Sequence, residues 1–373
     1  MSYADTLDRL RSEGNFRRIP QATSSAGLID FSLNDYLGLG SRQDLQEVFF
    51  ADETNRRIAM TSSAARLLSS HQTEYEKLET LLSTLYGDRP ALLFNSGYHA
   101  NTGLISALAS EKDTLILADR LVHASIIDGI TLSRAPFRRF PHNDFARLET
   151  LLSREHDNYS HIIIAVESVY SMDGDTADLE TLCALKSRFP KSILYVDEAH
   201  AFGAVGVSGL GLCRGLQTFP EIDVIVGTFG KACASAGAFA IMTPTLRDYA
   251  VNRARSFIFS TAIPPMTCAW TRFMIEQIVG MEAERQHLLS LSGRLAANLG
   301  QESPRYITPV IIGSSNEAMR ISAQLLDKGI KVLPIRTPTV PPGTERLRIS
   351  LSAAMTLEQI DRLTDALKSA INQ

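Results

Sequence analysis

Short hydrophobic runs recur along the first part of the chain, and each run ends in polar residues. The runs occupy residues 91–94, 114–118, 162–166, 193–196 and 224–226. Their length and their content of Ile, Leu and Val are typical of strands that are buried on both faces of a sheet. Segments with helical spacing, such as 73–86 and 179–189, separate them. The pattern predicts an α/β fold with a mostly parallel central sheet flanked by helices.

The pattern changes near residues 257–265, where two prolines follow a Ser-Thr pair and indicate a boundary. A long helix is expected over 266–299, with an irregularity near Gly280, and an α+β pattern follows it. Thr356 and Gln359 form a capping-box pattern that predicts the start of the last helix. The predicted organisation is an N-terminal segment that packs with the small domain (1–40), a large α/β domain (41–258) and a smaller α+β C-terminal domain (259–373).

The composition excludes several classes of protein. A hydrophobic content of 45% and a charged content of 21% over 373 residues are those of a globular protein. The net charge of −4 gives no reason to expect a nucleic-acid or anionic-membrane partner. No apolar run approaches the roughly 20 residues that a membrane span needs. The four cysteines form no CxxC pair, so we expect reduced thiols in a cytoplasmic protein.

Two polar residues follow predicted strands, at the edge where parallel sheets bind ligands. Asp197 comes directly after one strand, and Lys231 follows a later strand through a glycine-rich turn. A loop lysine and a buried acid are the ordinary alternatives for each alone. Together they fit pyridoxal phosphate (PLP), a cofactor that needs a Schiff-base lysine and a carboxylate at its pyridine nitrogen. Thr228 and the turn at residues 96–98 would supply phosphate donors, and His200 can reach the ring hydroxyl.

Other motif interpretations fit less well. Residues 197–200 spell DEAH, but a nucleic-acid motor needs an earlier phosphate loop, and the segment 227–231 is too short and comes later. Residues 209–215 miss the dinucleotide-binding GxGxxG pattern by one position and follow no clear strand. The histidines lie on different predicted elements, and we predict no metal site.

Several segments together resemble the α-oxoamine synthases, which are PLP enzymes of fold type I. They are SGYHAN (96–101), DRLVHAS (119–125), SMDGD (171–175), VDEAH (196–200) and GTFGKA (227–232). The resemblance runs nearly end to end, from NDYLG at 34–38 to LRIS at 347–350. It implies the type I PLP-dependent transferase fold, an acyltransferase that joins an amino acid to an acyl thioester with loss of CO2, and a homodimer with shared active sites.

The resemblance also implies a role for each matching residue. Lys231, Asp197 and His123 would be catalytic, with Lys231 as Schiff-base lysine and proton acceptor and His123 stacked on the ring. The cofactor-binding set would be Gly97, Tyr98, His123, Ser171, Asp197, His200, Thr228, Lys231, Ser260 and Thr261. Of these, Ser260 and Thr261 resemble residues that reach the phosphate of the partner subunit. Asn34 and Arg348 resemble residues that bind the amino-acid carboxylate.

Residues 335–344 carry the clue to the substrate. Their Pro-Thr-Val-Pro form resembles family members that condense L-alanine with pimeloyl-CoA or pimeloyl-carrier protein in biotin biosynthesis, and Thr339 would contact the substrate. Members that use glycine with acetyl-CoA, or serine with palmitoyl-CoA, stay as alternatives. A catalytically silent partner subunit, which usually lacks the lysine, is a further alternative.

The chain departs from the family pattern at two places. Phe16 stands where the family has a substrate-binding arginine, which leaves Arg17 as a substitute. Residues 61–66, TSSAAR, replace a glycine-rich segment. Both departures bear on the acyl chain, whose length and carrier the sequence leaves open.

Overall fold

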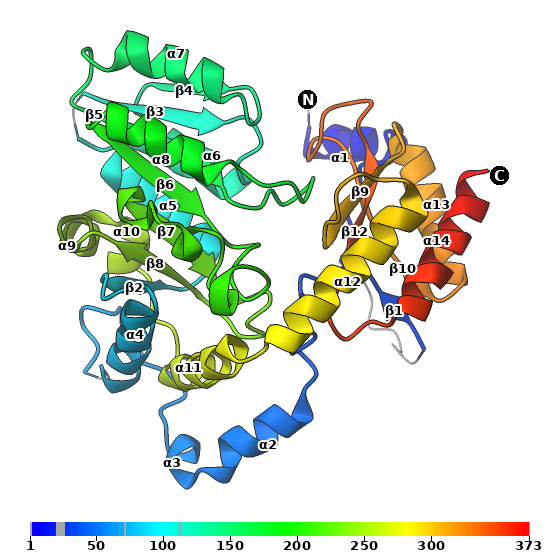
Figure 1. The fold of residues 1–373 in the computed structure, drawn as a ribbon, viewed down its shortest axis with the longest axis horizontal. Helices are drawn as coiled ribbons and strands as arrows, with labels where there is room; N and C mark the ends of the chain where they lie inside the picture. Colours follow the sequence, from blue (N-terminus) through cyan, green and yellow to red (C-terminus); the bar gives the residue numbers. More distant parts are fainter. Residues whose placement is uncertain (1, 20–26, 71, 112, 373) are drawn as a thin grey trace. The chain divides into compact units, whose positions relative to one another are not determined.

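The computed structural model describes residues 2–19, 27–70, 72–111 and 113–372, which form two compact units. Unit 1 takes the residues up to Tyr36, Met172–Gly174 and the residues from Gln286; unit 2 takes Leu37–Ser171 and Asp175–Arg285 (Figure 1). The N-terminal segment is thus grouped with the C-terminal residues. The division falls after Arg285 rather than after residue 258, because helix α11 (Pro265–Val279) packs against α4 (Thr73–Leu85) within unit 2.

Unit 2 is built on a seven-stranded sheet. In spatial order its strands are β2 (Ala91–Phe94), β8 (Ala238–Met242), β7 (Val224–Thr228), β6 (Ser192–Asp197), β5 (His161–Glu167), β3 (Thr114–Asp119) and β4 (Phe137–Phe140). Within this sheet, β8 runs opposite to the other six strands, which are parallel to one another. The five predicted strands all lie in it, which confirms a mostly parallel central sheet. The strands β4 and β8 were not predicted.

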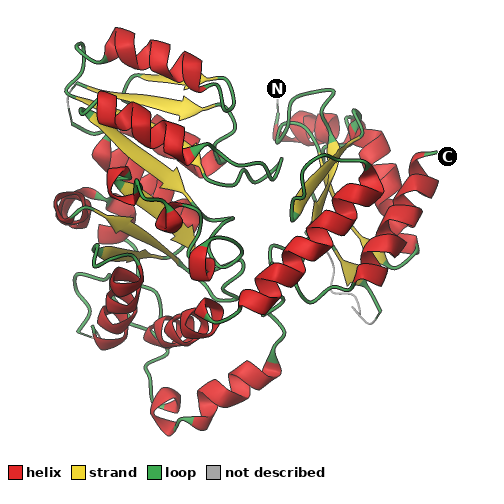
Figure 2. Cartoon of the chain, in the orientation of Figure 1, coloured by secondary structure: helices red, strands yellow, loops and turns green. Residues whose placement is uncertain are grey.

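Helices lie on both faces of this sheet (Figure 2). Apart from α4 and α11, unit 2 contains α2 (Gln43–Ala51), α3 (Glu53–Arg56), α5 (Gly97–Leu108), α6 (Ala124–Ser133), α7 (Phe145–Glu155), α8 (Leu179–Arg188), α9 (Pro244–Arg253) and α10 (Arg255–Ile258). Three short 3-10 turns lie between β6 and β7, at Val207–Gly209, Cys213–Gly215 and Phe219–Glu221. Alternate strand residues, such as Ile163 and Tyr195, join the buried cluster with α5 and α6. Covered faces on both sides explain why the strands are continuously hydrophobic.

The predicted helix over 266–299 consists of two helices, α11 and α12 (Glu282–Leu299), separated at Gly280. Gly280 follows the last residue of α11, and its N–H donates to the carbonyl of Gln277. Glycine is a poor helix former, so ending the helix there costs little free energy. The predicted irregularity at Gly280 is confirmed, and the first residues of α12 mark the division between the two units.

Unit 1 has an α+β structure. Besides α12 it contains α1 (Tyr3–Ser12), β1 (Ile29–Asp30), β9 (Ile307–Ile311), α13 (Ser315–Asp327), β10 (Ile330–Lys331), β11 (Leu333–Ile335), β12 (Arg346–Ser350) and α14 (Leu357–Ile371). The strands β11, β12 and β9 form an antiparallel sheet, and β1 pairs with β10 in parallel. The capping box at Thr356 and Gln359 is present at the start of α14, as predicted.

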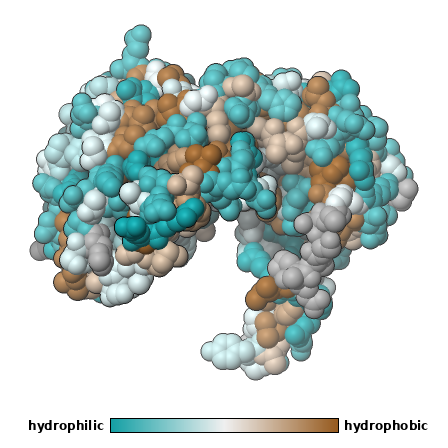
Figure 3. Space-filling model, turned by 90° about the horizontal axis from the view of Figure 1, so that it is seen from below, coloured by the Kyte–Doolittle hydropathy of each residue, from teal (hydrophilic) through white to brown (hydrophobic). Residues whose placement is uncertain are grey.

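The surface agrees with the balanced composition. Hydrophobic and hydrophilic residues are interspersed on the face shown in Figure 3. Within the described ranges, no helix combines the length and the apolar character that crossing a membrane requires.

Candidate active site

A cavity of about 170 Å3 opens beside the carboxyl ends of β5, β6 and β7 in unit 2. It is lined by Gly97, Tyr98, Asn101, His123, Ser125, Glu167, Asp197, Ala199, His200, Thr228 and Lys231. The predicted residues among these are Gly97, Tyr98, His123, Asp197, His200, Thr228 and Lys231. The structure therefore brings the predicted lysine, acid and imidazoles to one cavity, at the sheet edge where α/β folds bind ligands.

Lys231 lies in the turn after β7, and its Nζ is 2.8 Å from Nε2 of His200. The turn is held by Thr228, whose Oγ1 donates to the carbonyl of Gly237 at 3.1 Å and accepts the N–H of Gly230 at 3.2 Å. Gly227 has a packing role, because a Cβ there would lie 2.4 Å from the ring of Phe239. The glycine thus lets β7 and its lysine turn pack closely against β8.

Asn101 connects the acid to the imidazole of His123. Its Nδ2 donates to Oδ2 of Asp197 at 2.7 Å and to Oγ of Ser125 at 2.9 Å, and its Oδ1 accepts the hydroxyl of Tyr195 at 2.7 Å. The N–H of Ala199 donates to the other carboxylate oxygen of Asp197 at 2.8 Å. A flipped amide would turn an oxygen toward the carboxylate, so an ionised Asp197 fixes the orientation of Asn101.

His123 caps the N-terminus of α6. Its Nδ1 accepts the N–H of Ser125 at 3.2 Å and lies 2.8 Å from the Ser125 hydroxyl. Because Nδ1 is an acceptor, the neutral ring carries its proton on Nε2. Burial lowers the pKa of His123, and the charge of Lys231 lowers it further while that of Asp197 opposes both. His123 is thus a neutral imidazole that can donate a hydrogen bond from Nε2.

The N-terminus of α5 offers an anion site next to the cavity. Ser96 caps the helix by accepting the N–H of His99 at 3.2 Å. Gly97 lies close to Thr228, since a Cβ at Gly97 would be 3.8 Å from Cβ of Thr228. Helix N-termini attract phosphate through unpaired N–H groups and the helix dipole. The residues around Gly97 therefore suit a phosphate group.

The comparisons with known proteins agree with this geometry. The family model "Aminotransferase class I and II" matches residues 26–367. The chain belongs to this family. The chain is similar over nearly its whole length to a curated protein of Chlorobaculum parvum named 8-amino-7-oxononanoate synthase. The two are 43% identical over 380 residues, which cover 97% of this chain and 96% of the relative.

Two solved structures have folds similar to that of this chain. A structure of SPT with the PLP internal aldimine matches with a TM-score of 0.89 and 27% identity, and covers 99% of this chain and 98% of its own. The crystal structure of 8-amino-7-oxononanoate synthase from Francisella tularensis matches with a TM-score of 0.76 and 27% identity, and covers 92% and 98%.

Three of the predicted cofactor-binding residues, Ser171, Ser260 and Thr261, lie outside the lining of the cavity. Ser171 donates its N–H to Oε2 of Glu167 at 3.2 Å, so it is adjacent to a lining residue. Ser260 lines a separate small cavity, and the carbonyl of Thr261 accepts a hydrogen bond from Asn95 at 2.7 Å. Ala65, in the segment that lacks the family's glycines, pairs with Thr261 through an isolated β-bridge.

The predicted substrate residues belong to unit 1. The guanidinium of Arg348 on β12 is buried and donates to Oδ1 of Asn34 at 3.1 Å. Arg17 donates to the hydroxyl of Thr339 at 3.2 Å. The ring of Phe16 instead faces the guanidinium of Arg11, 4.6 Å from its centroid. Arg17 therefore lies beside the predicted substrate loop.

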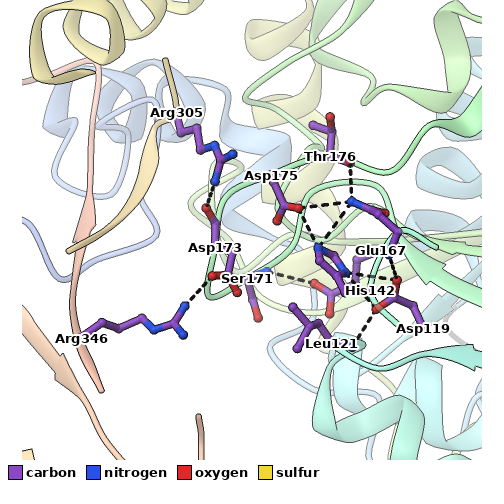
Figure 4. A network of polar contacts seen from close by, with 11 residues as sticks. Asp119, Leu121, His142, Glu167, Ser171, Asp173, Asp175, Thr176, Arg305 and Arg346 are labelled. Carbon is purple, nitrogen blue, oxygen red and sulfur yellow. Dashed lines mark hydrogen bonds and ion pairs between the residues drawn. The ribbon is translucent and has the colours of Figure 1, made fainter. Parts of the chain in front are cut away.

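A polar network that the sequence did not predict lies at the end of β3. Figure 4 shows the imidazole of His142 between the carboxylates of Asp119 and Asp175. Its Nδ1 is 3.0 Å from Asp119, and its Nε2 is 2.7 Å from Asp175. Burial alone would lower the pKa of His142, but the two carboxylates outweigh it and raise the pKa to about 10. His142 is therefore an imidazolium that anchors Asp175, at the end of the loop that begins with Ser171.

Asn101, Ser125 and Glu167 line the cavity but were not predicted from the sequence. Asn101 and Ser125 lie in the quoted segments 96–101 and 119–125, so the segments contained the only available signal. Glu167 directly follows a predicted strand, as Asp197 does, and this position could have pointed to it. In the described part of the chain, no cluster of three or more His, Cys, Asp or Glu residues suits a metal ion.

Proposed function

We propose that this protein condenses L-alanine with a pimeloyl thioester, on CoA or a carrier protein, using PLP. The products are 8-amino-7-oxononanoate, CO2 and the free thiol, and the reaction belongs to biotin biosynthesis. The observation that carries the proposal is the shared cavity of Lys231, Asp197 and His123. The name of the relative at 43% identity supports the choice of reaction.

The residues of the cavity fit PLP. A buried acid, a lysine and a helix N-terminus are the groups that the pyridine nitrogen, the aldehyde and the phosphate of this cofactor require. Lys231 would hold the aldehyde carbon, Asp197 the pyridine nitrogen, and Gly97, Tyr98 and Thr228 the phosphate. His200 and Ser171 would contact the ring hydroxyl. When bound, PLP supplies an electron sink for the negative charge that develops at the α-carbon of the amino acid.

The chain's own residues would then move protons and hold charges. Lys231 takes the α-proton of alanine, and His200 orients its Nζ at 2.8 Å. Asp197, held by hydrogen bonds from Asn101 and Ala199, keeps a negative charge at the pyridine nitrogen. His123 donates from Nε2 to the thioester carbonyl and stabilises the charge that grows on its oxygen.

Four predicted residues would recognise the two substrates. Arg348 binds the carboxylate of alanine, since a guanidinium forms two parallel hydrogen bonds with a carboxylate, and Asn34 orients it. Arg17 and Thr339, which contact each other, would bind the acyl substrate. The substitution of Phe16 for the family's arginine makes Arg17 the candidate for the terminal carboxylate of a pimeloyl chain.

A substrate screen tests this function. The PLP-loaded protein is offered alanine, glycine or serine, each with acetyl, pimeloyl or palmitoyl thioester, and thiol release is measured. Alanine with pimeloyl thioester is expected to give the highest kcat/KM. The high TM-score to SPT makes serine palmitoyltransferase the second candidate, and glycine C-acetyltransferase is the third. Turnover only with serine and palmitoyl-CoA, or only with glycine and acetyl-CoA, would replace the proposal by the respective sister enzyme.

We also propose a cytoplasmic homodimer in which Ser260 and Thr261 complete the phosphate site of the partner subunit. The exposed side chains of Phe259 and Leu68, with 68% and 81% of their area accessible, support an interface in this region. Mixing Lys231→Ala with Thr261→Ala protein would restore activity in hybrid dimers, because one of the two shared sites is then intact. Activity that stays absent in proven hybrids would rule out shared sites.

A further inference from the structure

Glu167 and Asp197 are carboxyl groups on neighbouring strands at the cavity. The two residues are direct partners in the parallel register of β5 and β6. Both line the cavity, and both are buried, with 2% and 4% of their area accessible. Two carboxylates cannot both be charged at one buried place without a large electrostatic cost. One of them is therefore expected to hold a proton.

The hydrogen-bond donors around the pair decide which one. Asp197 accepts from the side-chain amide of Asn101 at 2.7 Å and from the N–H of Ala199 at 2.8 Å, so each carboxylate oxygen has a donor. Glu167 accepts from the N–H of Ser171 at the longer distance of 3.2 Å. Its Oε1 is buried and has no hydrogen-bond partner among the described residues. Hydrogen bonds to the charged form favour ionisation, so the negative charge belongs on Asp197.

The charges around Glu167 point the same way. Burial raises the pKa of Glu167 well above its ordinary value, and the charge of Asp197 raises it further. The charge of Lys231 and the N–H group of Ser171 act against this rise but do not cancel it.

We propose that Glu167 is the neutral member of this carboxyl pair and holds its proton on the wall of the cavity. The pair then carries a single negative charge, on Asp197, where the proposed function needs it. The neutral carboxyl of Glu167 is a proton-holding group for an acceptor oxygen of the bound cofactor or amino acid. Only the identity of that acceptor rests on the proposed function.

Infrared spectroscopy of the cofactor-free protein tests the protonation directly. We expect a carbonyl-stretch band of a protonated carboxylic acid at pH 7, shifted by 13C labelling of glutamate and absent from Glu167→Gln. Glu198→Gln is the matched control, because Glu198 is also a buried acid, with a pKa raised by burial to about 7. The Glu198 band should titrate near pH 7, whereas the Glu167 band should persist at pH values where the Glu198 band has been lost. Loss of a carboxylate band, rather than an acid band, in Glu167→Gln would overturn the proposal.

The affinity for PLP gives a second and independent readout. Glutamine keeps the neutral charge and shape of a protonated glutamate, so Glu167→Gln should keep the Kd within about threefold, whereas Glu167→Ala should raise it by about tenfold. A rise in Glu167→Gln as large as that in Asp197→Asn would show that Glu167 is charged. Failure of alanine and pimeloyl thioester to react, with the acid band present, would refute the proposed function and leave the carboxyl pair intact.

Discussion

Replacing His142 by glutamine should destabilise the protein strongly at neutral pH and only slightly at pH 11. His142 forms hydrogen bonds to two carboxylates, and Asp119 is fully buried. The variant leaves both carboxylates without a positive charge. Asp119 would still accept hydrogen bonds from the N–H groups of Leu121 at 2.7 Å and Asn143 at 2.9 Å, which limits the loss of stability.

The magnitude follows from the pKa of about 10 in the folded protein, which exceeds the ordinary value of 6.5. A raised pKa means that the folded state binds the proton more tightly, so the stabilisation is complete below pH 6.5 and is lost as the pH rises through 10. A pH of 7 lies about three units below the pKa of the folded state. At about 1.4 kcal/mol for each unit, the bound proton stabilises the folded state at this pH by about 4 kcal/mol. Compensation by the two N–H groups reduces the expected loss to about 3 kcal/mol.

Urea unfolding between pH 6 and pH 11, followed by circular dichroism, measures this difference in the free energy of unfolding. His161→Gln is the matched control, because His161 is exposed and belongs to the same unit. Subtracting the control removes the titration of other groups at high pH. A difference between wild type and His142→Gln that stays constant from pH 7 to pH 11 would refute the reasoning. An NMR titration that puts the pKa of His142 near 6.5 would do the same.

Three further predictions concern single side chains. Because burial raises the pKa of Glu198 from 4.5 to about 7, stability should fall by about 3 kcal/mol as the pH rises from 4.5 to 8, and Glu198→Gln should remove this fall in urea titrations. Asn101→Ala should raise the Kd for PLP by about tenfold, whereas Thr102→Ala on the same helix should not; equal effects would contradict the role of Asn101. Gly227→Ala should cost about 2 kcal/mol or more in unfolding experiments, because its Cβ collides with Phe239, and Phe239→Leu should partly restore the stability.

The hydrophobic pattern predicted the centre of the fold because both faces of the sheet are covered. The strand β4 escaped prediction for the opposite reason: its residues Phe137–Arg139 are exposed, so its sequence shows no hydrophobic run. The strand β8 directly follows the small residues of the lysine turn, and no polar segment marks where the strand begins. The boundary between the domains was predicted after residue 258, whereas the two units divide after Arg285, because α11 packs on α4 and stays in unit 2.

The sequence located Lys231 and Asp197 because ligands bind at the carboxyl ends of parallel strands. It could not locate contacts that depend on register and on helix rotation. Glu167 meets Asp197 only through the pairing of β5 with β6, and Asn101 meets Asp197 across 96 positions of the chain. His142 contacts Asp119 and Asp175, which lie in two separate segments of the chain. Such contacts follow from the packed structure rather than from local patterns.

Reductive trapping of the cofactor is the most direct test of the central claim, that PLP is bound at the cavity of Lys231 and Asp197. The protein is incubated with PLP, reduced with borohydride and digested, and the modified peptide is identified by mass spectrometry. We predict a phosphopyridoxyl group on Lys231 alone. A stoichiometric label on a different lysine, with Lys231 unmodified, would contradict it.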